Sequence, residues 1–329
     1  MRDIVKKQLA QIHKYYSGCK DQIDNGKSVY VDDLMNFLNK QITIFTKDIN
    51  SFNKTSNTEL ITPQLLNLAA IYYLLDESSY EFSNQLILDD PTRTHQWQNE
   101  ARIRLTLLFL NRLAEAIYLL QGGFASAAIA RARGMYEVAV FMEIILSHDE
   151  DLAEKFLKYC NVESDTILNK LIESQPAKFK NKIGLEVQSI PTEIKYGKNF
   201  SKPYGWAHGL VKGCYITFNK LAKTTSLYSL HGLYSMCCPS SHASIFDSIG
   251  GIGLNKSERG KSIWKTGGSS DGVSNAIDII EQFICHIIPN ISGPPDSMFI
   301  ILFLSNSMDI EKNTTNKSSN NPSSENFPT

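Results

Sequence analysis

The stretch that decides the fold is GGFASAAIARARGMYEVAVFMEIILS, residues 122–147, which carries apolar or small side chains on every face of a helix. At about 100° per residue, Ala130 and Ile144 lie on one side of such a helix and Met135 lies on another. A helix that is apolar all round is enclosed by other elements. We therefore predict an all-α fold, a multi-helix bundle around a central enclosed helix at about residues 124–147.

Apolar residues at helical spacing predict further helices on both sides of this stretch. Two long helices are expected after Thr62, which is placed as an N-cap before Pro63, and Pro91 forces the break between them. Strand signals are nearly absent. The other predicted helices cover residues 1–17, 31–50, 149–172, 205–222, 226–238 and 273–288.

Composition divides the chain into three parts. We predict an N-terminal helical region at residues 1–90 and a helical core domain at residues 91–308. The remaining residues, 309–329, include EKNTTNKSSNNPSSENFPT, which has almost nothing to bury. This tail is predicted to be disordered.

Charge and apolar runs restrict the function classes. The net charge of −1 over 329 residues gives no broad attraction to nucleic acid or to a membrane surface. No apolar run approaches the ~18 residues that a membrane-spanning helix needs, and no leader pattern is present, so we expect a cytoplasmic protein. Any binding of nucleic acid must come from a local patch.

The cysteines indicate reduced thiols rather than a disulfide framework, because six are scattered without a Cys-x-x-Cys pair. Cys237 and Cys238 are adjacent and point to different faces of a helix, and no second Cys/His pair stands at ligand spacing. We expect no metal and no cofactor. Cys237 or Cys238 could also form a nucleophilic pair with His242, but buried, unreactive thiols are more common.

The central helix carries charges at positions where burial is expected. Arg133 and Glu137 stand at i, i+4, close enough to pair. A charged pair on an enclosed helix costs several kcal/mol unless partners satisfy it. Such a pair is either a structural network or part of a site.

A second polar cluster lies in YSMCCPSSHASIF, residues 234–246. Pro239 is expected to break the preceding helix, and Ser240 or Ser241 is expected to cap the next one. His242 would then lie in a first helical turn, where the helix dipole favours the neutral imidazole. That placement suits a general base, and the alternative is a core histidine held by a carbonyl group.

These segments resemble a bacterial all-helical family of unknown function, DUF5677. The resemblance runs over about Trp97 to Ile288 and includes AIARARGMYEVAVFMEIIL, YGWAHGLVKGCYITFNKLA and LYSMCCPSSHAS. It implies a helical fold with an Arg-x-x-x-Glu on a central helix and a His shortly after a Tyr-Ser helix, but no reaction. In this chain those features map onto Arg133, Glu137, Tyr234, Ser235 and His242.

A Gly-, Ser- and Lys-containing loop follows His242 at residues 248–272. Its segment NKSERGKS ends like a phosphate-binding P-loop, but Asn255 stands where that motif requires Gly and no strand precedes it. The loop is either a solvated surface or a basic site for phosphates. The candidate binding residues are Lys256, Arg259, Lys261, Trp264 and Trp206.

Three classes of function remain open. The first is a metal-independent ribonuclease-like effector of a bacterial antiphage defence or toxin system, with RNA as its partner. In this class His242 is the general acid/base and Arg133 stabilises the phosphoryl charge, while Glu137 orients either His242 or Arg133. Ser241 and Tyr234 complete this candidate catalytic set.

The chain also resembles the remote HEPN class of helical nucleases, only in being helical with an Arg/Glu/His set. It departs from the HEPN pattern because no Arg or Lys stands in the nine residues before His242. The second class is a non-enzymatic binding or sensor module with a buried polar network, and the third is a small-molecule enzyme. A homodimer or a defence-system protein is the expected protein partner.

Overall fold

A computed structural model describes the chain over residues 1–24, 28–55, 62–174, 195–212, 215–241, 268 and 270–319. Side chains at residues 21–24, 28–31, 52–55 and 307–319 are outside this description. Within these ranges every regular element is helical, and one isolated β-bridge joins His208 to Val211. The predicted all-α class is confirmed.

The chain divides into two compact units. The boundaries between them fall inside α3, α4, α5 and α10, so these helices contribute residues to both units. The predicted domain limits at residues 90 and 308 stay a prediction. Unit 1 comprises Met1–Asn84, Phe109–Met135 and Leu233–Thr329, and unit 2 comprises Gln85–Leu108 and Tyr136–Gly232.

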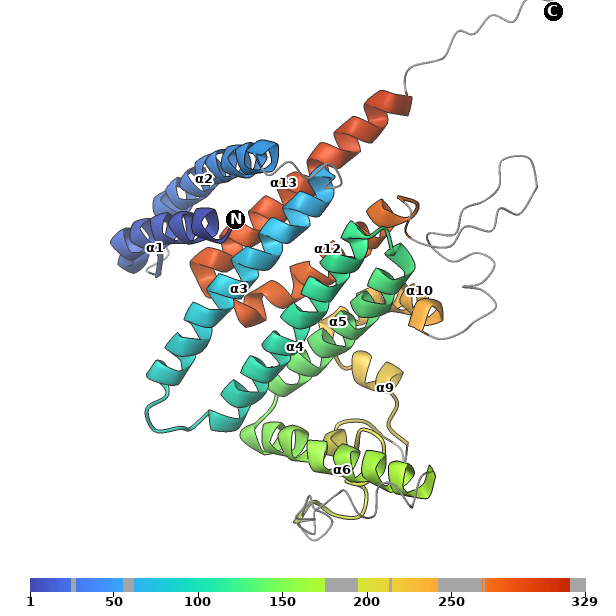
Figure 1. Cartoon of the computed structure of the whole chain (residues 1–329). Helices are drawn as coiled ribbons and strands as arrows, with labels where there is room; N and C mark the ends of the chain where they lie inside the picture. The colour runs from blue at the N-terminus through green and yellow to red at the C-terminus, as the bar shows by residue number, and fades with distance from the viewer. Residues whose placement is uncertain are drawn as a thin grey trace, which may run out of the picture. The chain divides into compact units, whose positions relative to one another are not determined.

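In unit 1, α1 (Arg2–Asp24) and α2 (Ser28–Thr55) lie side by side (Figure 1). Each helix buries apolar residues three or four positions apart, as Leu34 and Leu38 do on α2. Gln8 Nε2 donates to Gln41 Oε1 at 2.9 Å, which satisfies two buried side chains between the helices. The predicted helices at residues 1–17 and 31–50 are therefore present and longer than expected.

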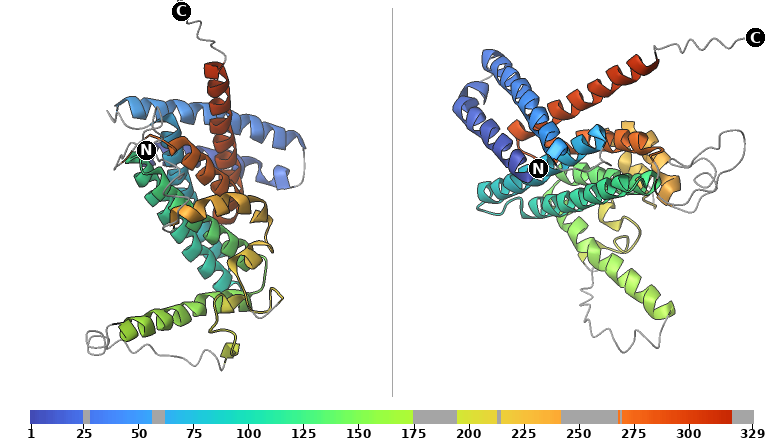
Figure 2. Two further views of the ribbon diagram at one scale, coloured as in Figure 1. Left: turned by 90° about the vertical axis from the view of Figure 1, so that its right-hand side faces the viewer. Right: turned by 45° about the horizontal axis from the view of Figure 1, so that its top comes forward.

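Two C-terminal helices, α12 (Val273–Ile291) and α13 (Pro294–Ser319), also belong to unit 1 (Figure 2). α13 contacts both α1 and α2. Phe45 of α2 lies edge-on to Phe299 and Phe303, with ring centroids 5.7 and 5.2 Å apart. The N-terminal hairpin is thus closed by a helix from the other end of the sequence.

The tail beyond these contacts is only partly described. α13 is helical as far as Ser319, and the exposure of its side chains is described up to residue 306. Residues 320–329 lie outside the described part of the chain. Of the residues 309–329 that were predicted to be disordered, residues 309–319 belong to α13 and the rest lie outside the description.

The helices α3 (Pro63–Asp89) and α4 (Gln96–Gln121) begin and end where the sequence indicates. Thr62 caps α3, because its Oγ1 accepts from the backbone N–H of Leu65 at 3.2 Å. In the break that contains Pro91, the Asp90 carboxylate accepts from the backbone N–H groups of Thr94 and His95 at 2.7 and 2.8 Å. These bonds satisfy donors just before α4 starts.

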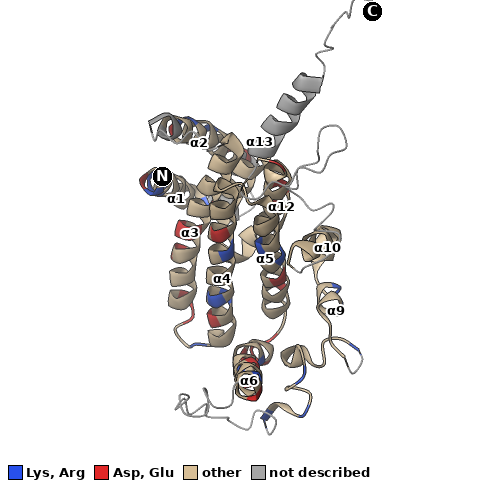
Figure 3. Cartoon of the chain, turned by 45° about the vertical axis from the view of Figure 1, so that its right-hand side comes forward, with Lys and Arg blue, Asp and Glu red and all other residues tan. Residues whose placement is uncertain are grey.

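The central helix α5 spans Ala125–Leu146 and is buried around most of its circumference, as predicted for residues 124–147. Small residues permit close packing there: the Arg112 guanidinium of α4 occupies the space that a Cβ at Gly134 would need. Figure 3 shows that α4 and α5 carry charges of both signs. On α5 the basic Arg131 and Arg133 precede the acidic Glu137 and Glu143.

Unit 2 contains α6 (Glu150–Ser174), which was predicted at residues 149–172, and the short elements η1 (Gly205–Ala207), α9 (Phe218–Ala222) and η2 (Ser226–Leu230). The predicted helix over residues 205–222 is wrong, since only its two ends are helical. η1 ends at its C-cap His208, whose backbone is extended, and Gly209 follows with φ +103°, a conformation that other residues rarely adopt. Helical structure resumes with α9 after its N-cap Thr217, whose side chain accepts from the backbone N–H of Lys220.

The helix α10 spans His231–Ser241 and continues through Pro239. The predicted break at Pro239 is therefore wrong. A proline removes one intrahelical hydrogen bond, and near the last turn of a helix this loss is small enough to be tolerated. Ser240 and Ser241, one of which was predicted to cap the next helix, are instead the last two residues of α10, and His242 lies outside the described residues.

No helix among the described residues is both long enough and apolar enough to cross a lipid bilayer.

Candidate functional site

The described members of the predicted catalytic set lie on two helices. Arg133 and Glu137 stand one turn apart on α5, and both are half-buried. Tyr234 and Ser241 lie on α10, and His242 follows directly after its last residue but outside the described part of the chain. The distance from His242 to Arg133 therefore stays untested.

Arg133 packs on an aromatic ring. Its guanidinium carbon lies 5.6 Å from the centroid of the Tyr234 ring, and Tyr234 is only 8% exposed. A cation–π contact of this kind contributes roughly 0.5–2 kcal/mol. The contact joins α5 to α10 within unit 1, so Arg133 has a packing role whatever else it does.

The remaining predicted residues show local or structural contacts. The Ser241 hydroxyl donates to the Cys237 carbonyl at 3.4 Å, and its side chain is exposed. Trp206 is 2% exposed and lies in an aromatic cluster, so burial of its ring disfavours the predicted contact with a ligand. Lys256, Arg259, Lys261 and Trp264 lie outside the described residues.

Glu143, also on the central helix, has a structural role that sequence reasoning missed. Its carboxylate accepts from the backbone N–H of Ser226 at 2.6 Å and from the Ser226 hydroxyl at 3.0 Å. These bonds satisfy donors where η2 begins. The partners are 83 positions apart, so no local spacing rule could have indicated the pair.

The geometry disfavours a cysteine nucleophile at α10. Cys237 is fully buried, and burial is the main reason that the pKa of its thiol rises to about 12. The thiolate is the reactive form, so a thiol in this environment is inert.

We expect iodoacetamide to label exposed Cys160 at least about 100-fold faster than Cys237 in the folded protein, because Cys237 is buried and its raised pKa suppresses the reactive thiolate. Peptide mass spectrometry after short exposures measures both rates. In denaturant the two rates should converge. Equal labelling of the folded protein would restore the nucleophile hypothesis.

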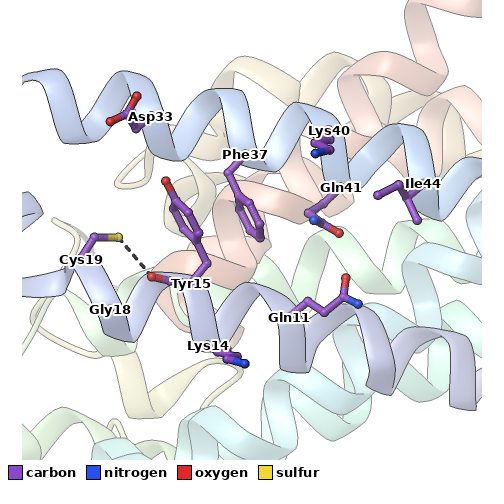
Figure 4. A pocket seen from close by; sticks show the side chains of 10 residues that line it. All are labelled: Gln11, Lys14, Tyr15, Gly18, Cys19, Asp33, Phe37, Lys40, Gln41 and Ile44. Carbon is purple, nitrogen blue, oxygen red and sulfur yellow. Dashed lines mark hydrogen bonds between the residues drawn. The ribbon is translucent and has the colours of Figure 1, made fainter.

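A groove with a volume of about 770 Å³ lies between α1 and α2 (Figure 4). We call it the hairpin groove. In Figure 4 the two helices run in opposite directions, and Tyr15 and Phe37 point toward each other between them. Its lining residues are Gln11, Lys14, Tyr15, Gly18, Cys19, Asp33, Phe37, Lys40, Gln41 and Ile44.

An aromatic stack spans the hairpin groove. The rings of Tyr15 and Phe37 are nearly parallel, with an interplanar angle of 5° and centroids 3.9 Å apart. Cys19 lies beside them and donates from Sγ to the Tyr15 carbonyl at 3.2 Å. Burial raises the pKa of the Tyr15 hydroxyl, so this group stays a neutral hydrogen-bonding group at physiological pH.

Two lysines flank the stack from opposite walls. Lys14 comes from α1 and Lys40 from α2, and both are exposed. Within the described part of the chain neither forms an ion pair, and Asp33 is the acidic residue of the lining. The groove thus combines an apolar aromatic floor with two available positive charges.

Sequence reasoning missed this groove because it predicted helices at residues 1–17 and 31–50 without pairing them. The half-buried aromatic residues Tyr15 and Phe37 and the exposed Ile44 were a possible signal. Their convergence depends on the pairing of α1 with α2, which no local pattern specifies.

The comparisons with known proteins give a family and no activity. Residues 100–258 match the model of a family described as "Family of unknown function (DUF5677)". Neither the curated proteins nor the solved structures contain a match. The match includes Arg133, Glu137 and all of α10, and the hairpin groove lies outside it. Residues 100–258 are therefore similar to the DUF5677 family, as the resemblance in the sequence indicates.

Proposed function

We propose that the chain is a non-enzymatic helical binding module of the sensor type, whose hairpin groove takes a small organic anion with an aromatic or aliphatic body. The observation that carries the proposal is the groove itself, with the Tyr15–Phe37 stack and a lysine on each wall. We expect this module to act in the cytoplasm.

The size of the hairpin groove supports a small molecule as the ligand. Sites for small molecules commonly have volumes of roughly 300–1,000 Å³ and are mostly apolar with a few polar groups. The groove, at about 770 Å³, lies within that range. Gln11 and Gln41 add amide donors and acceptors to its lining.

The charges support an anion. An apolar body would cover the exposed faces of Tyr15 and Phe37, and an anionic group would lie between Lys14 and Lys40. Nucleotides and aromatic carboxylates or sulfonates belong to this chemical class.

A fluorescent probe of matching chemistry tests the proposal. 8-Anilino-1-naphthalenesulfonate has an aromatic body and one negative charge, and we expect the folded protein to bind it saturably. In the double variant Lys14→Glu/Lys40→Glu the affinity should fall at least about tenfold, or 1.4 kcal/mol, because two favourable charges become repulsive. Fluorescence titration measures the effect.

Lys7→Glu/Lys47→Glu is the matched control, since it makes the same charge change on the same two helices at exposed residues outside the lining. It should keep wild-type affinity. N-phenyl-1-naphthylamine, which lacks the sulfonate, should bind wild type and the groove variant alike. Unchanged sulfonate binding in Lys14→Glu/Lys40→Glu would refute the proposal.

The ribonuclease hypothesis is the competing proposal, and one observation favours it. Half-buried Arg133 contacts Tyr234 on α10, the helix that leads directly to His242. Against it, Ser241 lies seven residues after Tyr234, about 10 Å farther along the helix axis. Arg133 and His242 would then reach one phosphate only if the chain turns back after α10.

Cleavage of labelled single-stranded RNA in the presence of EDTA decides between the two proposals. A binding module should leave the RNA intact, with no difference between wild type and His242→Ala. Cleavage by wild type that is lost in a folded His242→Ala variant would overturn the binding proposal and support the nuclease.

A further inference from the structure

A second cluster of polar side chains lies in unit 1, apart from the residues that line the hairpin groove. It brings together His13 of α1, Glu81 of α3 and Asp296 of α13. His13 Nε2 lies 2.7 Å from Asp296 Oδ1, and His13 Nδ1 lies 3.3 Å from Glu81 Oε2. One imidazole thus bridges two carboxylates that are far apart in the sequence.

The burial of these residues is graded from inside to outside. The Asp296 side chain is 3% exposed, that of His13 is 35% exposed and that of Glu81 is 54% exposed. The inner carboxylate is therefore fixed by packing, while the outer carboxylate can rotate and water can reach the imidazole. This is the arrangement of a site with access from solvent.

Buried hydroxyl groups fix the helix start that carries the inner carboxylate. Asp296 belongs to the first turn of α13, next to Ser297. The Ser297 hydroxyl donates to the Ser292 carbonyl at 2.9 Å, and the two hydroxyls lie 2.8 Å apart in a buried pair. The basic residues Arg2 and Lys6 on α1 pair with other acidic residues of α3, so they do not neutralise the cluster.

We propose that His13, Glu81 and Asp296 form a binding site for a divalent transition-metal cation of the zinc type. One imidazole nitrogen and two carboxylate oxygens are a ligand set that Zn²⁺ accepts, and water would complete the coordination. One ligand atom from each residue lies within 4.8 Å of the others. For an ion to bind, His13 Nε2 and Asp296 Oδ1 must separate from 2.7 Å to the roughly 3.3 Å spacing of ligands with ~2 Å bonds, and the exposed Glu81 side chain must rotate toward the same ion.

In the metal-free state, a proton on the His13 imidazole takes the position of the metal ion. Both ring nitrogens face carboxylates, and both can donate only when the imidazole is protonated. The hydrogen bond to Asp296 raises the pKa of His13 accordingly. On binding, the imidazolium releases this proton to solvent, and the ring nitrogen coordinates the metal.

The sequence predicted no metal site, because no pair of Cys or His residues stands at ligand spacing. The three ligands of the proposed site come from three helices, and His13 and Asp296 are 283 positions apart. Only the packing of α13 against α1 brings them together. Metal binding would therefore fasten α1, which forms one wall of the hairpin groove, to α3 and α13.

Titration of the full chain with Co²⁺ and Zn²⁺ tests the proposal. We expect saturable Co²⁺ binding with visible bands of a nitrogen- and oxygen-ligated ion, without the intense near-ultraviolet thiolate band that cysteine ligands give. Zn²⁺ should displace the Co²⁺ and raise the thermal midpoint. Bands of thiolate ligation would place the ion on cysteines and overturn the proposal.

Variants identify the ligands. Glu81→Gln changes a half-exposed side chain that the fold tolerates, and it should weaken Zn²⁺ binding at least about tenfold. His13→Ala should abolish binding. His95→Ala is the matched control, because His95 faces Glu150 at 3.9 Å in an exposed pair without a third ligand, and it should bind as wild type does. Wild-type Zn²⁺ affinity in Glu81→Gln would overturn the proposal.

Discussion

Replacing Trp206 with alanine is expected to lower the free energy of unfolding by about 3–5 kcal/mol, as for other large aromatic side chains removed from a core. The indole is 2% exposed. It lies edge-on to Phe141 and Phe156, with ring centroids 5.5 and 5.0 Å apart, so its removal leaves a cavity inside unit 2. Urea unfolding followed by far-ultraviolet circular dichroism measures the change.

Two further variants serve as controls for the Trp206→Ala measurement. Trp206→Phe should recover part of the loss, because it keeps an aromatic ring in the cluster. Tyr215→Ala removes a ring that is 76% exposed, so it should change stability by less than about 0.5 kcal/mol. If Trp206→Ala kept full stability and weakened ligand binding instead, Trp206 would belong to a binding surface.

Gly205→Ala is expected to cost about 3 kcal/mol, because an added Cβ has no room beside the backbone. That Cβ would overlap the Phe200 carbonyl oxygen and would lie 2.6 Å from the Asn199 carbonyl oxygen. Backbone atoms in a turn cannot move aside as the end of a flexible side chain can. Urea unfolding again provides the measurement.

Gly232→Ala is the matched control, because a Cβ there meets no atom within 4 Å and lies inside α10. Alanine is the better helix former by about 0.5–1 kcal/mol, so this variant should be at least as stable as wild type. Equal stability of Gly205→Ala and Gly232→Ala would show that the turn at residues 199–205 relaxes without cost.

The long helices could be predicted from sequence because their evidence is local. Apolar residues recur at helical spacing through α3, α4 and α5, and Thr62 with Pro63 marks a helix start. Two predictions were wrong because the effect of a single glycine or proline was weighed incorrectly against the surrounding helical pattern. Apolar periodicity hid the turn at Gly209, and Pro239 was given more weight than its position near a helix end justifies.

The candidate sites could be predicted much less well, because their residues come from different helices. Arg133 and Glu137 share one helix, so their spacing was visible, but the contact of Arg133 with Tyr234 was not. The lysines of the hairpin groove and the ligands around His13 become neighbours only after α1, α2 and α13 pack together. Which residues become neighbours is therefore decided by tertiary packing and not by any local sequence pattern.

The packing of Phe45 against Phe299 and Phe303 has a consequence for synthesis of the protein. α2 leaves the ribosome more than 200 residues before α13 does. At a synthesis rate of about 5–20 residues per second, roughly 10–50 s pass between the synthesis of α2 and that of α13, the helix that covers its aromatic face. During translation the N-terminal hairpin is therefore a natural client for chaperones that shield apolar surface.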